Sequence, residues 1–265
     1  MDPRESESAS ICPCAVPDKL LPDEKSNLQE TAGSTRELSS SARHTDTRGL
    51  IIFDVCGTLY NSNTTFDFLE FYWSRKGAHL SLVFLRLSRS LIGKIFWAVA
   101  SRVSGKDLFR TVAIRTLAGE RCDAVEAVAQ TFAHDILASR SISPVIELFR
   151  AQRLSGARLV LLSASICPVV RAIAINLSAD GYYCTSLVVN DGRYGGSIER
   201  DMRGIKKQVY LQEMERGGDF TFVTNNREDL PLLEIASTAY IVARNKDLKF
   251  WKSRMPAHAR LIGVG

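Results

Sequence analysis

Four short apolar runs constrain the fold of this sequence more than any other feature. In each run, continuous apolar residues lead into polar ones, and the runs lie within residues 50–53, 157–165, 220–226 and 239–245. Continuous rather than alternating hydrophobicity is typical of strands that are covered on both faces of a parallel sheet. Helical patterns that end at glycine, such as residues 144–156 and 205–217, separate the runs. The sequence therefore predicts an α/β fold with a doubly wound, mainly parallel sheet.

The chain divides into three parts by composition. Residues 1–48 are rich in serine and charge and contain no aromatic residue, so we expect a disordered tail that cannot offset its ordering entropy. Residues 49–60 and 154–265 are assigned to the α/β core. Residues 61–153 have a mostly helical pattern and are too many for one crossover. We expect them to form an inserted helical cap beside the carboxyl end of the first strand, where ligands of such sheets bind.

Part of the expected cap, residues 78–105, is both apolar and basic, and no acid occurs in residues 71–106. A membrane-spanning helix is disfavoured, because Arg86, Arg89 and Lys94 would each cost about 2.5–3.5 kcal/mol at a bilayer centre. At 100° per residue these bases share one side of a helix, and the other side carries Phe84, Leu91, Ile95 and Val99. The pattern is typical of either a cap helix with one buried face or a helix in peripheral contact with a membrane.

Net charge and cysteine usage narrow the class of protein only slightly. A net charge of +5 is too small to select an anionic partner by itself. The six cysteines are scattered and show neither paired spacing nor the density of a disulfide scaffold. They indicate a reducing compartment, and we predict a cytoplasmic protein without a nucleic-acid partner.

Polar residues follow the apolar runs in a fixed order. Asp54 follows the first run in "FDVCGTLY", Ser163 ends the second in "LLSAS", residues 206–207 begin a helix in "GIKKQVYL", and "TNNREDLPLL" follows the third run. Taken singly, such residues are usually turn formers, helix caps or solvated helix faces. Because the carboxyl ends of parallel strands meet at one edge of a sheet, we expect these side chains to converge around one cavity.

Together these motifs resemble those of the haloacid dehalogenase-like (HAD) superfamily, in particular its phosphoserine-phosphatase-like branch. The resemblance covers residues 49–245 and includes "DGRYGGSI", which is similar to a hairpin motif of that branch. It implies a Rossmann-like core with a cap, and a small phosphorylated substrate. It also implies that Asp54 attacks phosphorus and forms an aspartyl-phosphate that water cleaves. Ser163 and the backbone amides around Gly57 and Thr58 would bind the phosphoryl oxygens.

The resemblance further implies a lysine that neutralises the phosphoryl group and positions the nucleophile. The family spacing, counted three residues from Gly204 and four back from Leu211, favours Lys207, with Lys206 as the alternative.

Two positions depart from the family motifs. Cys56 stands where the family has an aspartate that protonates the leaving oxygen and then activates water, and Asn225 replaces the first acid of the last motif. A thiol is a poor acid/base group, and losing such a group typically costs about 10²- to 10⁴-fold in rate. The implied Mg²⁺ would lie between Asp54, the backbone carbonyl of Cys56, Asn225 and Asp229, in a site that has lost one carboxylate.

Three functions are compatible with this pattern. The first is a phosphomonoester hydrolase that acts through Asp54 with weakened catalysis. The second is a metal-independent dehalogenase-type hydrolase, which needs no general acid because halide leaves unprotonated, although the lysine and hairpin motifs belong to the phosphatase branch. The third is a non-catalytic homologue that binds a phosphate ligand at a membrane surface through residues 78–105. A redox-sensing role for Cys56 is opposed by Asp54, which repels a thiolate.

Overall fold

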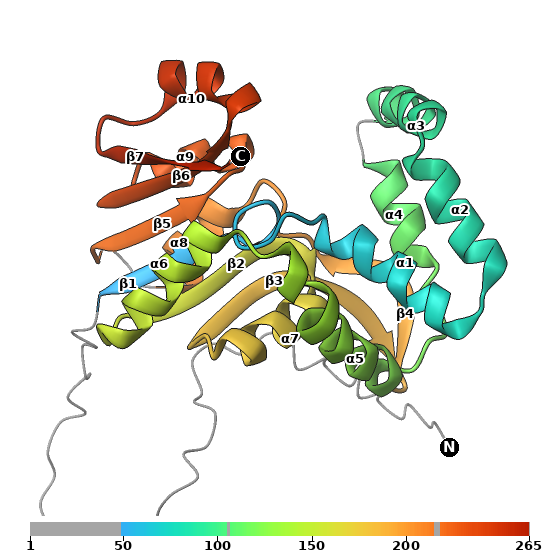
Figure 1. Ribbon diagram of the computed structural model, residues 1–265. Helices are drawn as coiled ribbons and strands as arrows, with labels where there is room; N and C mark the ends of the chain where they lie inside the picture. Colours follow the sequence, from blue (N-terminus) through green and yellow to red (C-terminus); the bar gives the residue numbers. More distant parts are fainter. Residues whose placement is uncertain (1–48, 105–106, 215–217, 265) are drawn as a thin grey trace, which may run out of the picture.

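The computed structural model describes residues 49–104, 107–214 and 218–264, so the predicted tail, residues 1–48, lies outside the described residues. The strands are β1 (Leu50–Phe53), β2 (Arg158–Ile166), β3 (Gly181–Asn190), β4 (Arg193–Arg200), β5 (Phe220–Thr224), β6 (Thr238–Arg244) and β7 (Ala259–Val264). They form one sheet in the order β4-β3-β2-β1-β5-β6-β7, visible edge-on in Figure 1. β3 and β4 pair antiparallel, whereas the other neighbouring strands pair in parallel. The predicted doubly wound, mainly parallel sheet is therefore confirmed.

The central strand β1 is apolar throughout because both of its faces are covered. Ile51 and Phe53 point into one hydrophobic cluster, and Leu50 and Ile52 point into the cluster on the opposite face. This division follows from the two-residue period of a strand. All four side chains are buried, which explains the continuous apolar run.

The strand order creates a switch point beside β1. From β1 the chain builds β2 and β3 on one side of the sheet, and it later builds β5, β6 and β7 on the other side. The connections that leave β1 and β5 therefore run in opposite directions. In open α/β sheets, ligands bind outside the carboxyl ends of the strands at such a point.

Helices fill the long connection between β1 and β2. These elements are α1 (Thr64–Lys76), α2 (His79–Arg89), α3 (Leu91–Ser104), α4 (Leu108–Arg115), α5 (Cys122–Thr131), a π-helix (Phe132–Ile136), a 3₁₀ turn (Ala138–Arg140) and α6 (Ser143–Leu154). Helices α1 to α4 form a layer beside the β3–β4 end of the sheet (Figure 1). Helix α6, in contrast, packs on β2 and β7 of the core. The predicted limits of a cap at residues 61 and 153 stay a prediction.

The predicted single helix over residues 78–105 is wrong, because the chain breaks at Ser90 into α2 and α3. The backbone of Ser90 is extended, with φ −63° and ψ 167°, and its hydroxyl oxygen accepts a hydrogen bond from the Gly93 N–H at 3.2 Å. A serine that accepts a bond from the amide three residues on is a typical start of a new helix. Positions on either side of this break therefore no longer share the faces that a continuous helix would give them.

The remaining helical elements follow β2. They are α7 (Cys167–Leu177), α8 (Lys206–Glu213), a 3₁₀ turn (Arg227–Asp229), α9 (Leu230–Leu233), a 3₁₀ turn (Asn245–Asp247) and α10 (Leu248–Arg254). The β3–β4 hairpin turns at Asp191 and Gly192, whose φ angles are +50° and +72°. Two successive positive φ angles fit the turn type that Asp-Gly favours in tight hairpins. The sequence "DGRYGGSI" therefore encodes this hairpin.

Candidate active site

Asp54 is held at the carboxyl end of β1 by the next strand. That strand is β5, the neighbour of β1 in the sheet. The Asp54 backbone N–H donates a hydrogen bond to the carbonyl oxygen of Val223 on β5 at 2.9 Å, which extends the β1–β5 pairing by one residue. The chain then turns sharply, and Gly57 adopts φ +74°. A Cβ atom at position 57 would lie 2.3 Å from Nδ2 of Asn225. Glycine is therefore required both by the backbone conformation and by the close approach of the loop that follows β5.

Lys206 joins two buried carboxylates. Its Nζ lies 2.6 Å from Oδ1 of Asp54 and 2.8 Å from Oδ2 of Asp229. Each of the three residues is only 4% exposed. Burial alone would lower the pKa of the Lys206 ammonium, but the charges of Asp54 and Asp229 outweigh burial and raise that pKa above its ordinary value. The lysine therefore stays charged, and its positive charge offsets the free-energy cost of burying a carboxylate beside it.

Thr58 and Asn225 surround the other oxygen of the Asp54 carboxylate. Thr58 Oγ1 lies 3.0 Å from Asp54 Oδ2 and 3.0 Å from Asn225 Oδ1. The same hydroxyl oxygen accepts a hydrogen bond from the Asn225 backbone N–H at 2.9 Å. Each carboxylate oxygen of Asp54 thus has its own partner, Lys206 on one side and Thr58 on the other. This arrangement fixes the orientation of the carboxylate.

Ser163 and Cys56 extend the polar site toward α1. Ser163 is fully buried, and its Oγ accepts a hydrogen bond from the Ser165 N–H at 3.2 Å. Cys56 Sγ lies 2.8 Å from Thr64 Oγ1, which in turn lies 2.6 Å from Ser165 Oγ. Burial and the charge of Asp54 raise the pKa of the Cys56 thiol. Cys56 is therefore a neutral thiol at pH 7, which removes the basis for a redox-sensing thiolate.

A cavity of about 670 Å³ opens above these residues. Its lining includes Asp54, Cys56, Ser163, Lys206 and Asn225, which the sequence singled out as candidates. Thr58 reaches the site through its hydrogen bonds to Asp54 and Asn225, and Asp229 reaches it through Lys206. The expected convergence of these side chains is thus observed, whereas their chemical roles stay predictions.

The favoured site lysine was the wrong one of the pair. Lys206 contacts Asp54, and among the described residues that line the cavity Lys206 is present and Lys207 is not. Helix α8 begins at Lys206, and successive helical residues point about 100° apart, so the next side chain is turned away. The family spacing placed the lysine one residue too far along the chain.

Two arginines of the cavity were missed by the sequence analysis. Arg110, on α4, is 7% exposed and donates to the Asp201 carboxylate at 2.6 Å and to the Ala164 carbonyl at 2.6 Å. Arg203 binds Glu228 at 2.9 Å and Asp107 at 2.6 Å. Neither arginine lies in a recognisable motif, because tertiary packing alone brings α4 and the β4–α8 loop to the cavity. Both arginines are thus paired with carboxylates beside the cavity.

The residues present do not fit a strong magnesium site. Asp229, a predicted ligand, instead contacts Lys206 and accepts a hydrogen bond from Thr224 at 2.7 Å. Near the Asp54 oxygen that faces Thr58, the other predicted side-chain ligand for a metal ion is the uncharged amide oxygen of Asn225. Within the described part of the chain, no group of three or more His, Cys, Asp or Glu residues is arranged to hold a metal ion. One carboxylate and an amide provide little charge for this hard cation.

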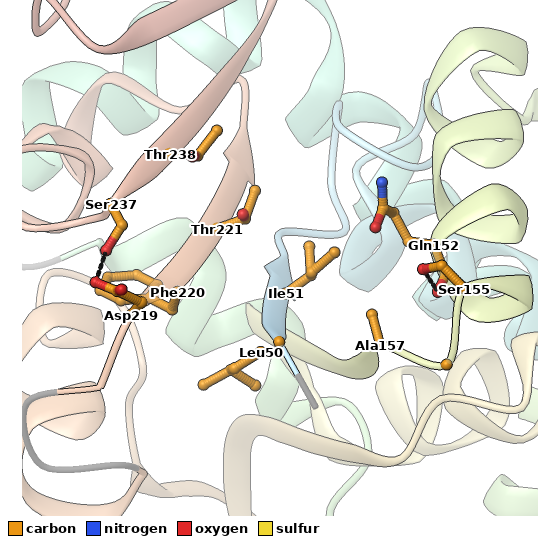
Figure 2. Close-up of a pocket in the computed structure, with 12 residues that line it drawn as sticks. Leu50, Ile51, Gln152, Ser155, Ala157, Asp219, Phe220, Thr221, Ser237 and Thr238 are labelled. Carbon is orange, nitrogen blue, oxygen red and sulfur yellow. Dashed lines mark hydrogen bonds between the residues drawn. The ribbon is translucent and has the colours of Figure 1, made fainter. Parts of the chain in front are cut away.

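A second cavity of about 660 Å³ lies at the opposite, amino end of β1 and β5. Figure 2 shows Leu50 and Ile51 between the end of α6 on one side and the starts of β5 and β6 on the other. Its polar residues are exposed or half-buried, and exposed Ser237 donates a hydrogen bond to exposed Asp219 at 2.6 Å. This cavity supplies a comparison of equal size on the same strands.

Comparison with known proteins identifies the family. The model of the haloacid dehalogenase-like hydrolases matches residues 51–234. A probable phosphatase of Mycobacterium tuberculosis is 23% identical over 233 residues, which cover 86% of this chain and 77% of that protein. A protein of unknown function from Bordetella pertussis has a similar structure, with a TM-score of 0.64 and 19% identity over 82% of this chain and 98% of the other. A probable phosphoserine phosphatase of Vibrio cholerae aligns with a TM-score of 0.51 and 13% identity, over 80% and 60% of the respective chains.

The protein therefore belongs to the haloacid dehalogenase-like hydrolase family. The predicted resemblance to its phosphoserine-phosphatase-like branch is confirmed at the level of fold.

Proposed function

We propose that the protein hydrolyses small phosphomonoesters through an aspartyl-phosphate formed on Asp54. The observation that carries this proposal is the state of the Asp54 carboxylate, which is buried at the base of a cavity with one oxygen bound to Lys206 and the other to Thr58. These two contacts hold the carboxylate in one orientation, and a carboxylate oxygen is the group that attacks phosphorus.

The neighbouring groups supply donors for phosphoryl oxygens. Lys206 carries positive charge to the point of attack, and Ser163 acts as an acceptor toward Ser165, so it keeps its own proton to donate. Arg110 and Arg203 also line the cavity, where carboxylates hold their guanidinium groups in place. Fixed donors in a partly dry site stabilise the charge that develops on the phosphoryl group during transfer.

The reaction has two steps. In the first, an Asp54 oxygen forms a bond to phosphorus, the bond from phosphorus to the leaving oxygen breaks, and the leaving group takes a proton. In the second, water attacks phosphorus, phosphate departs, and the Asp54 carboxylate is restored. A thiol at position 56 is a weak donor for the first step and supplies no carboxylate base for the second. We therefore expect slow turnover that favours leaving groups with low pKa values, such as aryl oxides.

The two other functions receive less support. A dehalogenase-type hydrolase is disfavoured because the lysine motif and the hairpin motif belong to the phosphatase branch. A purely binding role gives no reason to hold both oxygens of the Asp54 carboxylate in place at the base of a cavity. The probable phosphatase among the relatives also supports hydrolysis of a phosphate ester. The predicted cytoplasmic location stays a prediction.

The decisive experiment measures phosphate release from an aryl phosphate by the Asp54→Asn variant. We expect a loss of about 10³-fold or more, because an amide does not form the covalent intermediate. The matched control is Asp219→Asn, which removes an acid from the opposite end of the same sheet and is expected to leave the rate unchanged. Acid quenching during turnover, followed by mass spectrometry, should place a phosphoryl group on the peptide that contains Asp54. Equal rates for Asp54→Asn and the unmutated protein would overturn the proposal.

A further inference from the structure

Helices α2 and α3 carry most of the exposed large apolar side chains of the described chain. Twelve large apolar side chains are exposed among the described residues, and eight of them lie on these two helices: Leu80, Val83, Leu87, Leu91, Ile92, Ile95, Phe96 and Val99. Exposed apolar residues scattered singly need no explanation, but a contiguous group indicates a contact surface. We call these eight side chains the α2–α3 surface.

The spacing of these residues places them on the outer faces of both helices. On α2, Leu80, Val83 and Leu87 recur every three to four residues, and on α3, Ile92 and Phe96 do the same. The opposite faces are already occupied: Leu85 is fully buried, and α2 packs on α1 while α3 packs on α4. In Figure 1, α2 and α3 lie on the side of this helical layer that is remote from the sheet. The α2–α3 surface is therefore not needed to hold the helical layer together.

The charge around the surface has one sign. Residues 71–106 contain seven Lys or Arg and no Asp or Glu. Arg86 and Arg102 are exposed on α2 and α3 themselves. Arg89, in contrast, pairs with Asp67 at 2.7 Å and Glu70 at 2.9 Å, so the basic side predicted for a single helix is divided between outward and inward positions. A partner that covers this surface must accept apolar side chains and attract cations.

An aromatic path connects the α2–α3 surface to the cavity. Exposed Phe96 contacts Trp97 with ring centroids 5.1 Å apart, and Trp97 contacts Phe109 at 5.7 Å. Phe109 stacks on Phe66 at 4.5 Å, and Phe66 lines the cavity above Asp54. Contacting aromatic rings therefore connect the α2–α3 surface to the lining of the cavity.

We propose that the α2–α3 surface docks on a lipid bilayer that contains anionic lipids. No helix in the described ranges is long and apolar enough to cross a membrane. The proposed contact is one of shallow insertion by the exposed side chains of α2 and α3. Apolar side chains enter the boundary of the acyl chains, and exposed Arg86 and Arg102 bind the headgroup phosphates. A second copy of the chain is a poorer partner, because pairing two such surfaces would bring like charges together.

Vesicle flotation tests the docking without reference to catalysis. The full chain is mixed with vesicles of phosphatidylcholine alone or with phosphatidylglycerol added. We expect the unmutated protein to float with the anionic vesicles. We expect the Ile92→Glu/Phe96→Glu variant to bind them at least about tenfold more weakly. The control is Leu154→Glu, which changes an equally exposed leucine on α6 (90% exposed) and should float normally. Thermal unfolding of each variant shows whether the fold is intact.

Several outcomes would overturn the docking. One is equal flotation of the double variant and the control. Another is no flotation of the unmutated protein, together with a dimer by light scattering that the double variant abolishes, because the surface would then join two copies. Arg86→Glu/Arg102→Glu should remove the preference for phosphatidylglycerol, and an unchanged preference would refute the electrostatic part.

The aromatic path extends the inference to the substrate, and this step rests on the proposed function. A docked molecule presents its cavity to phosphate groups at the membrane surface, so the substrate class would be a lipid with a terminal phosphomonoester. Phosphatidic acid in vesicles is a suitable probe, with a soluble aryl phosphate beside it. We expect Ile92→Glu/Phe96→Glu to lower release from vesicles at least about tenfold while leaving release from the soluble ester unchanged.

These readouts separate the two proposals. Flotation without hydrolysis of either ester contradicts the proposed function and leaves docking standing. Equal losses on both substrates would refute the lipid assignment.

Discussion

The two ends of the sheet hold cavities of nearly the same size, about 670 and 660 Å³, yet they differ in chemistry. At the carboxyl end, Asp54, Asp229 and Lys206 are buried together. At the amino end, Asp219 is exposed and accepts a hydrogen bond from Ser237 (Figure 2). Volume therefore says little about function here. Burying a charge is costly unless the charge is paired. Buried charged groups at the carboxyl end of the sheet therefore indicate that this end holds the functional site.

The direction of the strands explains this difference. All loops that leave the carboxyl ends of parallel strands meet at one edge, and the switch point between β1 and β5 opens a crevice there. Asp54 and Asn225 each follow a strand directly into that crevice. At the amino end, exposed Ser155, Asp219 and Ser237 line the cavity together with buried Leu50, Ile51 and Phe220.

The largest expected effect comes from restoring the missing acids at the carboxyl end. The variant Cys56→Asp/Asn225→Asp regains an acid/base carboxyl and a hard-cation ligand, so we expect phosphate release with Mg²⁺ to rise by about 10²- to 10⁴-fold. The measurement is the rate on an aryl phosphate as a function of Mg²⁺ concentration. The single variants separate the acid/base contribution from the metal contribution. A double variant that folds and stays as slow as the natural sequence would show that the carboxyl end lacks more than two acids.

Removal of the central cation should be nearly as damaging. In Lys206→Met two buried carboxylates lose their common partner, and we expect the free energy of unfolding to fall by about 3–5 kcal/mol and activity by about 10²- to 10³-fold. Lys207→Met is the matched control, because the neighbouring side chain does not line the cavity. Denaturant unfolding and a phosphate assay check both variants. Equal effects of the two substitutions would contradict the geometry around Asp54.

A smaller effect concerns the thiol at position 56. Burial and Asp54 raise the folded-state pKa of Cys56 above the ordinary value of 9.0, so the stability that this thiol contributes is full below pH 9 and is lost as the pH rises through the folded-state value. We expect Cys56 to be alkylated at pH 9 more slowly than a cysteine in a short peptide, as measured by mass spectrometry. Cys56→Ser should show a smaller loss of stability between pH 8 and pH 10. Rapid alkylation at neutral pH would indicate a thiolate instead.

The smallest effect is expected at the amino end. Ser237→Ala removes the exposed hydrogen bond to Asp219 and should change the free energy of unfolding by less than about 1 kcal/mol. Phosphate release should not change. A large loss of activity from this substitution would contradict the assignment of catalysis to the cavity at the carboxyl end alone.

Much of the fold and part of the site could be predicted from the sequence. Buried strands and the polar residues that follow them are local patterns, so the parallel sheet and the convergence of Asp54, Ser163 and Asn225 followed from chain order. The choice between Lys206 and Lys207 did not, because it depends on where α8 begins. Arg110 and Arg203 were also missed, since β2, β3 and β4 separate them in sequence and only packing brings them to one cavity.

The stretch over residues 78–105 shows the same limit. Its composition correctly indicated an amphipathic, basic segment, but the 100° rule assumed an unbroken helix. Ser90 ended that helix and turned Arg89 toward Asp67 and Glu70. Of the apolar residues that the periodicity selected, Leu91, Ile95 and Val99 are exposed, whereas Phe84 is half-buried.

By itself, the sequence determined the class of fold, the family motifs and the two altered positions, Cys56 and Asn225, because each is written in a few adjacent residues. The tertiary structure decided which lysine bridges the carboxylates, that the remaining acids surround a cation, and which face of α2 and α3 is left uncovered. These outcomes depend on side chains distant in sequence that compete for the same buried space and the same charge. Such competition is settled only when the whole chain is packed.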